Sequence, residues 1–184
     1  MKQDELLPGD LLLWRIHLRK SGFRKFISKI IGFFQPVIGE GGKLKKTYSH
    51  VAIVDYDTSY MLESTFPKAR KHIIEIPKMP FELEVYRVKR ANDVVGDFGL
   101  KAYEIALGWC HEHLGTRYDL LQLLSMGLLD SYNKKVCSTY VAVGYSRGNI
   151  ILSVNGAEDN LTSPNEIVDN KQEVKYVGKL KYGA

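Results

Sequence analysis

Short apolar runs with a two-residue period cluster in the middle and at the end of this 184-residue chain, and helical patterns are grouped around them instead of alternating with them. The runs are LLLW, SHVAIVDY, YMLESTF, HIIEIP, FELEVYRV and, near the end, VKYVGKLKYG. A doubly wound parallel sheet would need a helix between successive strands. The pattern therefore predicts an α+β fold with a central antiparallel sheet packed against helices, and the length suits one domain over residues 1–184.

Helical spacing marks the segments that would cover this sheet. Apolar residues predict a helix over residues 99–114, with Cys110 on its buried stripe. Residues 117–129 are apolar and are predicted to be helical. A further helix is predicted from about Cys137 to Val143, and the later SPNEIV is typical of a helix start.

Positive charge is concentrated near the N-terminus. Residues 15–46 contain nine Lys or Arg and one acid, Glu40, so this segment carries +8 and the rest about −3 of the chain's net +5. Within it, residues 21–34 place Phe and Ile at helical spacing with basic residues between them, which predicts a basic amphipathic helix in an insertion at about 21–46. Such a helix can contact an anionic membrane or another polyanion, or it can pack its apolar face on the protein's own core.

Composition excludes several classes of protein. Two cysteines cannot build a disulfide framework, and no zinc-finger spacing or phosphate-binding glycine loop is present, so no metal and no cofactor are predicted. No recognised nucleic-acid module accompanies the basic segment, so no specific nucleic-acid partner is expected. The start, MKQDELLPGDLLLW, has acids before any apolar run and does not predict a signal peptide, nor does any apolar run reach the about 18 residues of a membrane span. We expect a protein that stays in the cytoplasm or is exported by a route not visible in the sequence.

Cys137 is the first candidate for chemistry. It follows Lys134 and Lys135 and begins CSTYVAVGY, which predicts a thiol at a helix N-terminus. The helix dipole and the nearby lysines both favour the thiolate, which is the nucleophilic form. The alternative is a small, inert core residue, as free cysteines usually are.

His50 and Glu63 fall on two adjacent predicted strands. If the turn between the strands lies near Asp57, Glu63 stands opposite His50 or diagonal to it on the same face of the sheet. A carboxylate there would orient the imidazole and stabilise its charged form. A register slip of one residue would move Glu63 to the other face and leave His50 as a structural residue.

Six motifs occur along the chain in a fixed order: GDLLLW, SHVAIV, LES, LGTRYDLLQLL, CSTYVAVGY and SPNEIV. This order resembles the permuted branch of the NlpC/P60 superfamily, the YiiX/YebB-like group of papain-like hydrolases. In that branch the His strand comes first, a Glu follows on the next strand and the Cys comes late, which is the order of His50, Glu63 and Cys137. The resemblance covers nearly the whole chain, but the 21–46 insertion has no counterpart in the family pattern.

The resemblance implies a papain-like cysteine peptidase or amidase that forms an acyl-enzyme. Cys137 would be the nucleophile, His50 the base and Glu63 the residue that orients the base. Tyr118, in the RYD motif, would line the site and donate its hydroxyl toward the oxyanion, although an ordinary buried tyrosine is the alternative. The implied substrate is a peptide or another acyl amide, with cell-wall peptides as the first expectation.

Two other functions remain open at this point. A lipid thioesterase or acyltransferase of the same fold would use the same three residues with a different pocket. A non-catalytic module could instead keep the fold as a scaffold and bind an anionic surface through residues 21–46.

Overall fold

The structure, a computed structural model, describes residues 1–14, 48–75, 83–119, 136–154 and 162–180. The predicted basic helix and nearly all of the predicted 117–129 helix lie outside these ranges. Among the residues that are described, no helix combines the length and the apolar character that a membrane span requires.

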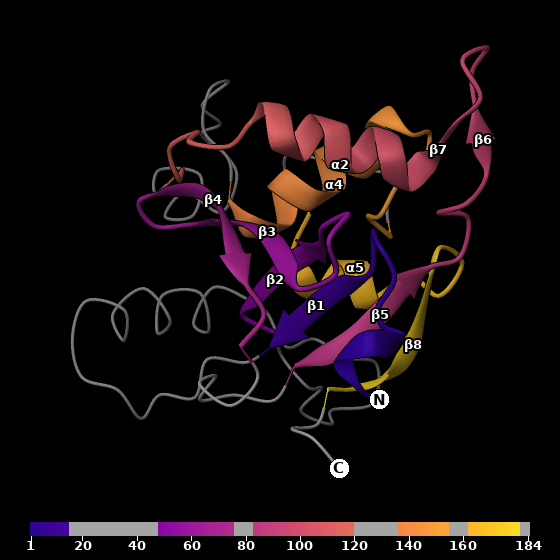
Figure 1. The fold of residues 1–184 in the computed structure, drawn as a ribbon. Helices are drawn as coiled ribbons and strands as arrows, with labels where there is room; N and C mark the ends of the chain where they lie inside the picture. Colours follow the sequence, from indigo (N-terminus) through magenta and orange to yellow (C-terminus); the bar gives the residue numbers. More distant parts are fainter. Residues whose placement is uncertain (15–47, 76–82, 120–135, 155–161, 181–184) are drawn as a thin grey trace, which may run out of the picture.

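A six-stranded antiparallel sheet forms the centre of the described structure, with the strand order β4-β3-β2-β1-β5-β8 (Figure 1). Its strands are β1 (Leu11–Trp14), β2 (His50–Val54), β3 (Tyr60–Thr65), β4 (Lys68–Ile73), β5 (Glu84–Val88) and β8 (Val174–Lys179). The antiparallel sheet is thus confirmed, and the last strand lies at its edge as predicted. The central strands β1 and β2 are buried at every position, so both faces of the sheet are covered there.

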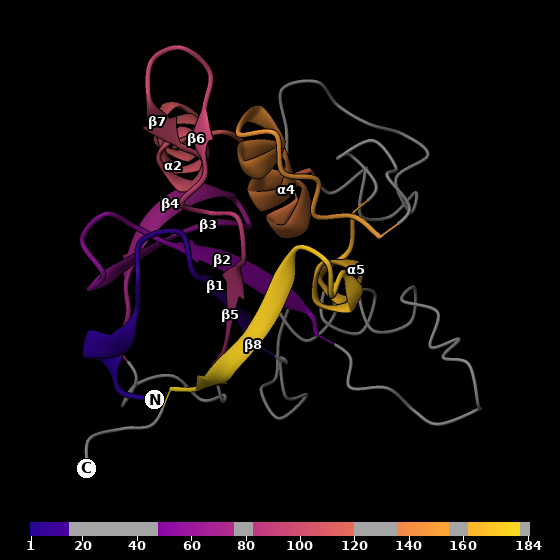
Figure 2. The same cartoon turned by 90° about the vertical axis from the view of Figure 1, so that its right-hand side faces the viewer.

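Within the described ranges, three α-helices accompany the sheet: α2 (Ala102–Glu112), α4 (Cys137–Arg147) and α5 (Pro164–Asp169). Helices α2 and α4 lie together on one side of the sheet, and α5 lies beside β8 (Figures 1 and 2). Val51 and Ile53 of β2 pack in the core cluster with both long helices. Ala52 and Val54, which alternate with them, pack in a second cluster on the other face.

The β2–β3 hairpin sets the register of the two strands that carry His50 and Glu63. Its turn lies at the predicted position, where the Tyr60 N–H donates to the Asp57 carbonyl at 2.9 Å. The pairing then matches Val54 with Met61 and Ile53 with Leu62.

Some boundaries differ from the sequence prediction. The strand predicted at HIIEIP lies earlier, over Lys68–Ile73, and helix α4 runs to Arg147 instead of Val143. The strand was misplaced because β4 is an edge strand whose residues are mostly charged. Such residues protect a sheet edge from pairing with another chain, but they leave no apolar alternation for the sequence prediction to detect. The small hairpin of β6 (Val94–Val95) and β7 (Leu100–Lys101) was also missed, so α2 begins three residues later than predicted.

The Gly9–Asp10 pair of the first motif joins the N-terminal turn to the core. Gly9 adopts a φ of +85°, and its carbonyl accepts a hydrogen bond from the hydroxyl of Tyr145 in α4. The Asp10 carboxylate accepts two hydrogen bonds from Arg87 in β5, each 2.7 Å long. A Cβ on Gly9 would come within 2.7 Å of both the Tyr103 Cβ and the Tyr145 hydroxyl, so the position needs glycine for its conformation and for its lack of a side chain.

We expect Gly9→Ala to lower the free energy of unfolding by about 3 kcal/mol, because it adds a steric clash to an unfavourable φ. Gly96→Ala is the matched control, since Gly96 has a φ of +69° but a Cβ there would meet nothing within 4 Å. It should cost only about 1 kcal/mol. Urea unfolding of the three proteins measures both values, and equal losses would contradict the packing argument.

Candidate active site

The site begins where strands β2 and β3 separate. Their ladder ends at the Ile53–Leu62 pair, although the same register would pair Val51 with Ser64. In this ladder the N–H groups of Asp55, Ile53 and Val51 point toward β3, as the bond from Asp55 to the Tyr60 carbonyl shows. The Val51 N–H instead donates to the sulfur of Cys137. The sulfur therefore accepts the N–H that continued pairing with β3 would have used.

Cys137 is the first residue of helix α4. Its predecessor Val136 is extended, and the N–H of Ser138, in the first turn, also donates to the sulfur. The side chain is buried but faces charged groups. Burial acts to raise the pKa of Cys137, but the positive charge of His50 and the hydrogen bonds from His50, Val51 and Ser138 outweigh it and lower the pKa below its usual value. This cysteine therefore favours the thiolate.

His50 bridges the thiol and a carboxylate. Its Nε2 lies 3.0 Å from Oε2 of Glu63, and it also shares a hydrogen bond with Cys137, for which Nδ1 is the ring nitrogen that remains. The indole of Trp14, its neighbour across the β1–β2 pair, packs on the imidazole with ring centroids 4.4 Å apart. Burial acts to lower the pKa of His50, but the charges of Cys137 and Glu63 and the hydrogen bonds to both raise it to about 10.

Glu63 lies diagonal to His50, which is one of the two placements that the sequence predicts. If the hairpin register is continued, Glu63 falls opposite Ala52, two positions from His50. The side chains of Glu63 and His50 therefore leave the same face of the sheet. Its second carboxylate oxygen, Oε1, accepts a hydrogen bond from Nε of Arg70 at 2.9 Å. Burial acts to raise the pKa of Glu63, but His50 and Arg70 lower it to about 2, so the buried side chain is a carboxylate at neutral pH.

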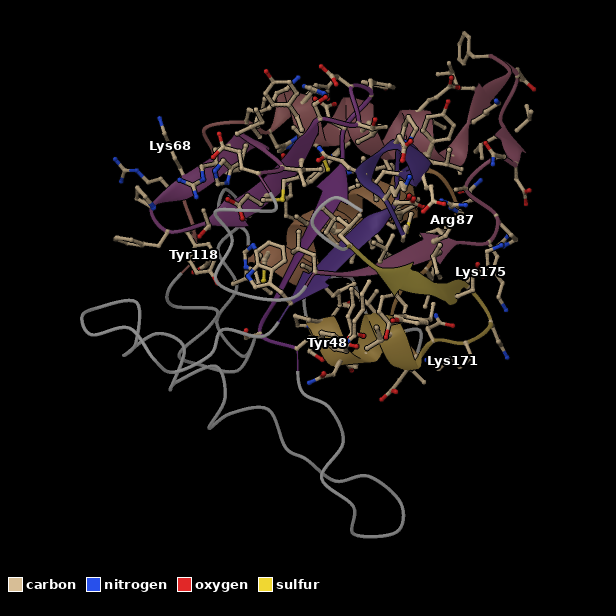
Figure 3. The ribbon with its side chains drawn as sticks, turned by 60° about the horizontal axis from the view of Figure 1, so that its bottom comes forward. Tyr48, Lys68, Arg87, Tyr118, Lys171 and Lys175 are labelled. Carbon is tan, nitrogen blue, oxygen red and sulfur yellow. The ribbon has the colours of Figure 1, made fainter. Side chains whose placement is uncertain are left out.

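Tyr118 is buried in the segment after α2. Its N–H donates to the carbonyl of Pro67 at 3.0 Å, and Figure 3 shows it near the start of β4, where Lys68 also lies. Burial and the nearby charge of Cys137 raise the pKa of Tyr118 well above its usual value. The hydroxyl therefore keeps its proton at neutral pH and remains a hydrogen-bond donor.

The structure thus links three residues selected from the sequence, Cys137, His50 and Glu63, by hydrogen bonds, and it buries Tyr118 where the charge of Cys137 still affects its pKa. Sequence reasoning missed Arg70, Trp14 and the N–H of Val51. The position of Arg70 could have been predicted from the sequence. Strands β3 and β4 are joined by the short Phe66-Pro67 link, and a hairpin predicted there would have placed Arg70 opposite Glu63. Trp14 and the Val51 N–H depend on the β1–β2 register and on the separation of β2 from β3, which the sequence pattern does not contain.

The second cysteine has a different environment. Cys110 is fully buried in the core against α4, and its Sγ lies 4.0 Å from the carbonyl of Tyr140. Burial raises the pKa of Cys110. In the part of the chain that the structure describes, no group of three or more His, Cys, Asp or Glu side chains is placed to hold a metal ion.

We expect brief treatment with iodoacetamide near neutral pH to label Cys137 and leave Cys110 unlabelled, because only the thiolate reacts and only Cys137 has a lowered pKa. Peptide mapping by mass spectrometry of the native protein measures the labelling of each thiol. Equal labelling, or labelling of Cys110 alone, would contradict the description of the site.

Comparison with known proteins does not assign the chain to a family. No protein-family model matches the chain, and the search of curated proteins gives no match. A function for this chain therefore has to be argued from the contacts among Cys137, His50 and Glu63.

Proposed function

We propose that this protein is a thiol hydrolase with the papain-like, circularly permuted NlpC/P60 fold, and that it cleaves an amide bond through an acyl-enzyme. The observation that carries the proposal is the unbroken chain of contacts from the Cys137 sulfur through the His50 ring to the Glu63 carboxylate. A nucleophile, a base and a group that orients the base are the three parts that covalent acyl transfer requires.

The fold supports the proposal through the elements that hold these parts. The thiol begins a helix that packs on an antiparallel sheet, and the base and its carboxylate lie on the two strands of one hairpin of that sheet. The chain order of His50, Glu63 and Cys137 is that of the permuted branch. Cys137 on α4 and His50 on β2 are both buried, and burial strengthens the attraction between the thiolate and the imidazolium.

In the proposed reaction, the Cys137 thiolate attacks the carbonyl carbon of the scissile amide, and the carbonyl oxygen takes the negative charge. The hydroxyl of Tyr118 and backbone N–H groups at the start of α4 donate hydrogen bonds to this oxygen. The His50 imidazolium then gives its proton to the leaving amine, and the C–N bond breaks. A thioester between Cys137 and the acyl group remains.

Water completes the cycle. Neutral His50 takes a proton from the water molecule, the hydroxide attacks the thioester carbonyl, and the acid leaves as the thiolate and imidazolium are restored. Throughout, Glu63 stays ionised and holds the ring through Nε2, so that Nδ1 faces the sulfur. The proposed substrate is a peptide or another acyl amide, and cell-wall peptides are the first class to test.

The experiment that tests the proposal looks for the thioester itself. Wild-type protein is mixed with a panel of cell-wall peptides, other peptide amides and fatty-acyl thioesters, and intact-protein and peptide mass spectra are recorded before and after turnover. We expect an acyl mass on Cys137 with an amide substrate and none in Cys137→Ala. Acylation from the lipid thioesters alone would replace the amidase by a lipid thioesterase or acyltransferase, and turnover by Cys137→Ala would contradict the proposal.

We expect His50→Ala to slow both turnover and alkylation of Cys137 by about 10²-fold or more, because the base creates the nucleophile. Glu63→Gln should reduce turnover less, since it only weakens the orientation of the ring. His111→Ala is the matched control, because His111 also pairs with a buried carboxylate, that of Asp55 at 2.7 Å, but on helix α2. It should keep full activity, and alkylation of His50→Ala at the wild-type rate would show that His50 is not paired with the thiol.

A further inference from the structure

The two oxygens of the Glu63 carboxylate have different partners. Oε2 faces His50 at 3.0 Å, whereas Oε1 faces both Nε and Nη2 of Arg70 at 2.9 Å. The Nε–H of Arg70 therefore donates to one oxygen, with the charged Nη2 within ion-pair distance of the same atom, and the other oxygen is left for the imidazole. A carboxylate held in this way cannot rotate about its terminal bond without losing charged contacts on both sides.

Arg70 reaches this buried carboxylate from the rim of the site. It stands directly opposite Glu63 in the β3–β4 pair, and its side chain is 44% exposed whereas that of Glu63 is 4% exposed. The next residue, Lys71, points to the other face of the strand, where it pairs with the buried Asp55 at 2.6 Å. Arg70 and Lys71, which are neighbours on one edge strand, thus each form an ion pair with a different buried carboxylate.

The charges of the site show what Arg70 contributes. A Cys137 thiolate, a His50 imidazolium and a Glu63 carboxylate together carry one net negative charge in a buried space. The Arg70 guanidinium brings this sum to zero, and an uncompensated buried charge is costly. The only other group facing Oε1 among the described residues is His72 of β4, whose Nδ1 lies at 3.4 Å and whose side chain is 44% exposed.

We propose that Arg70 is a positioning residue of the hydrolase: it fixes Glu63 with Oε2 toward His50 and balances the charge of the Cys137–His50–Glu63 group. This inference rests on the proposed function, because it concerns the same site. Arg70 acts through Glu63 and does not itself touch the reacting atoms. Its role requires the planar guanidinium, since a lysine at this position would offer a mobile point charge in place of a fixed donor with a second charged nitrogen beside it.

The test uses the alkylation of Cys137 as a function of pH, which needs no substrate. In wild type the rate should fall on the acid side where the thiolate becomes protonated. In Arg70→Gln, the pKa of Glu63 rises and the imidazolium of His50 loses support, so the acid limb should move to higher pH and the rate at neutral pH should fall about tenfold. Arg70→Lys should recover part of the loss.

Two controls separate positioning from a merely structural role. Lys71→Gln removes the ion pair between the next residue of β4 and a buried carboxylate, Asp55, and should leave the alkylation profile unchanged. Arg70→Gln introduced into Glu63→Gln should have little further effect, because the residue through which Arg70 acts is no longer charged. Thermal melts of every variant confirm that the folded protein is measured.

The outcomes distinguish this inference from the proposed function. If wild-type Cys137 reacts no faster than an ordinary thiol, the proposed function fails. If it reacts fast and Arg70→Gln has the wild-type profile, Arg70 is not a positioning residue and only this inference fails. A raised KM at unchanged kcat, with an unchanged alkylation profile, would assign Arg70 to substrate binding and would equally overturn it. An undiminished loss in the Glu63→Gln background would show that Arg70 acts by another route.

Discussion

The attraction between the sulfur of Cys137 and the ring of His50 is the interaction on which the described site depends. Either charge alone would be unfavourable in this buried position, because burial raises the pKa of the thiol and lowers that of the imidazole. Together, the two groups shift each other's pKa in the opposite directions and overcome burial. The pair is therefore one unit, and removal of either member changes the protonation of the other.

The backbone makes room for this pair. Strands β2 and β3 pair near their turn and then separate, so that the N–H of Val51 is free of the ladder and donates to the sulfur. The helix α4 delivers the thiol into the opening from one side of the sheet, while His50 and Glu63 extend from the strands that border it. The hairpin register matters in the same way, since a slip of one residue would place Glu63 on the opposite face, away from His50. The reactive geometry is thus a consequence of sheet pairing as much as of side-chain identity.

Local patterns in the sequence predict much of this arrangement. The alternation in SHVAIV and YMLES places β2 and β3, the Asp57 turn sets their register, and CSTYVAVGY is compatible with a helix that starts at the thiol. The contact between Cys137 and His50 could not be predicted in this way, because the two residues lie 87 positions apart in the chain and no local pattern indicates that α4 begins against β2. Arg70 was overlooked because β4 is a charged edge strand, and the predicted strand was placed four residues too late to bring Arg70 opposite Glu63.

The ionisation of Cys137 tests the central claim most directly. The ultraviolet absorbance of the thiolate can be titrated with pH in the wild type and in Cys137→Ser, and the difference isolates this one thiol from Cys110 and the tyrosines. The described geometry predicts that the difference signal is already present at neutral pH and disappears only on acidification, and that His50→Gln shifts its appearance to alkaline pH. A difference signal that emerges only above the ordinary thiol pKa of about 8.5, in the wild type as in His50→Gln, would contradict the ion pair.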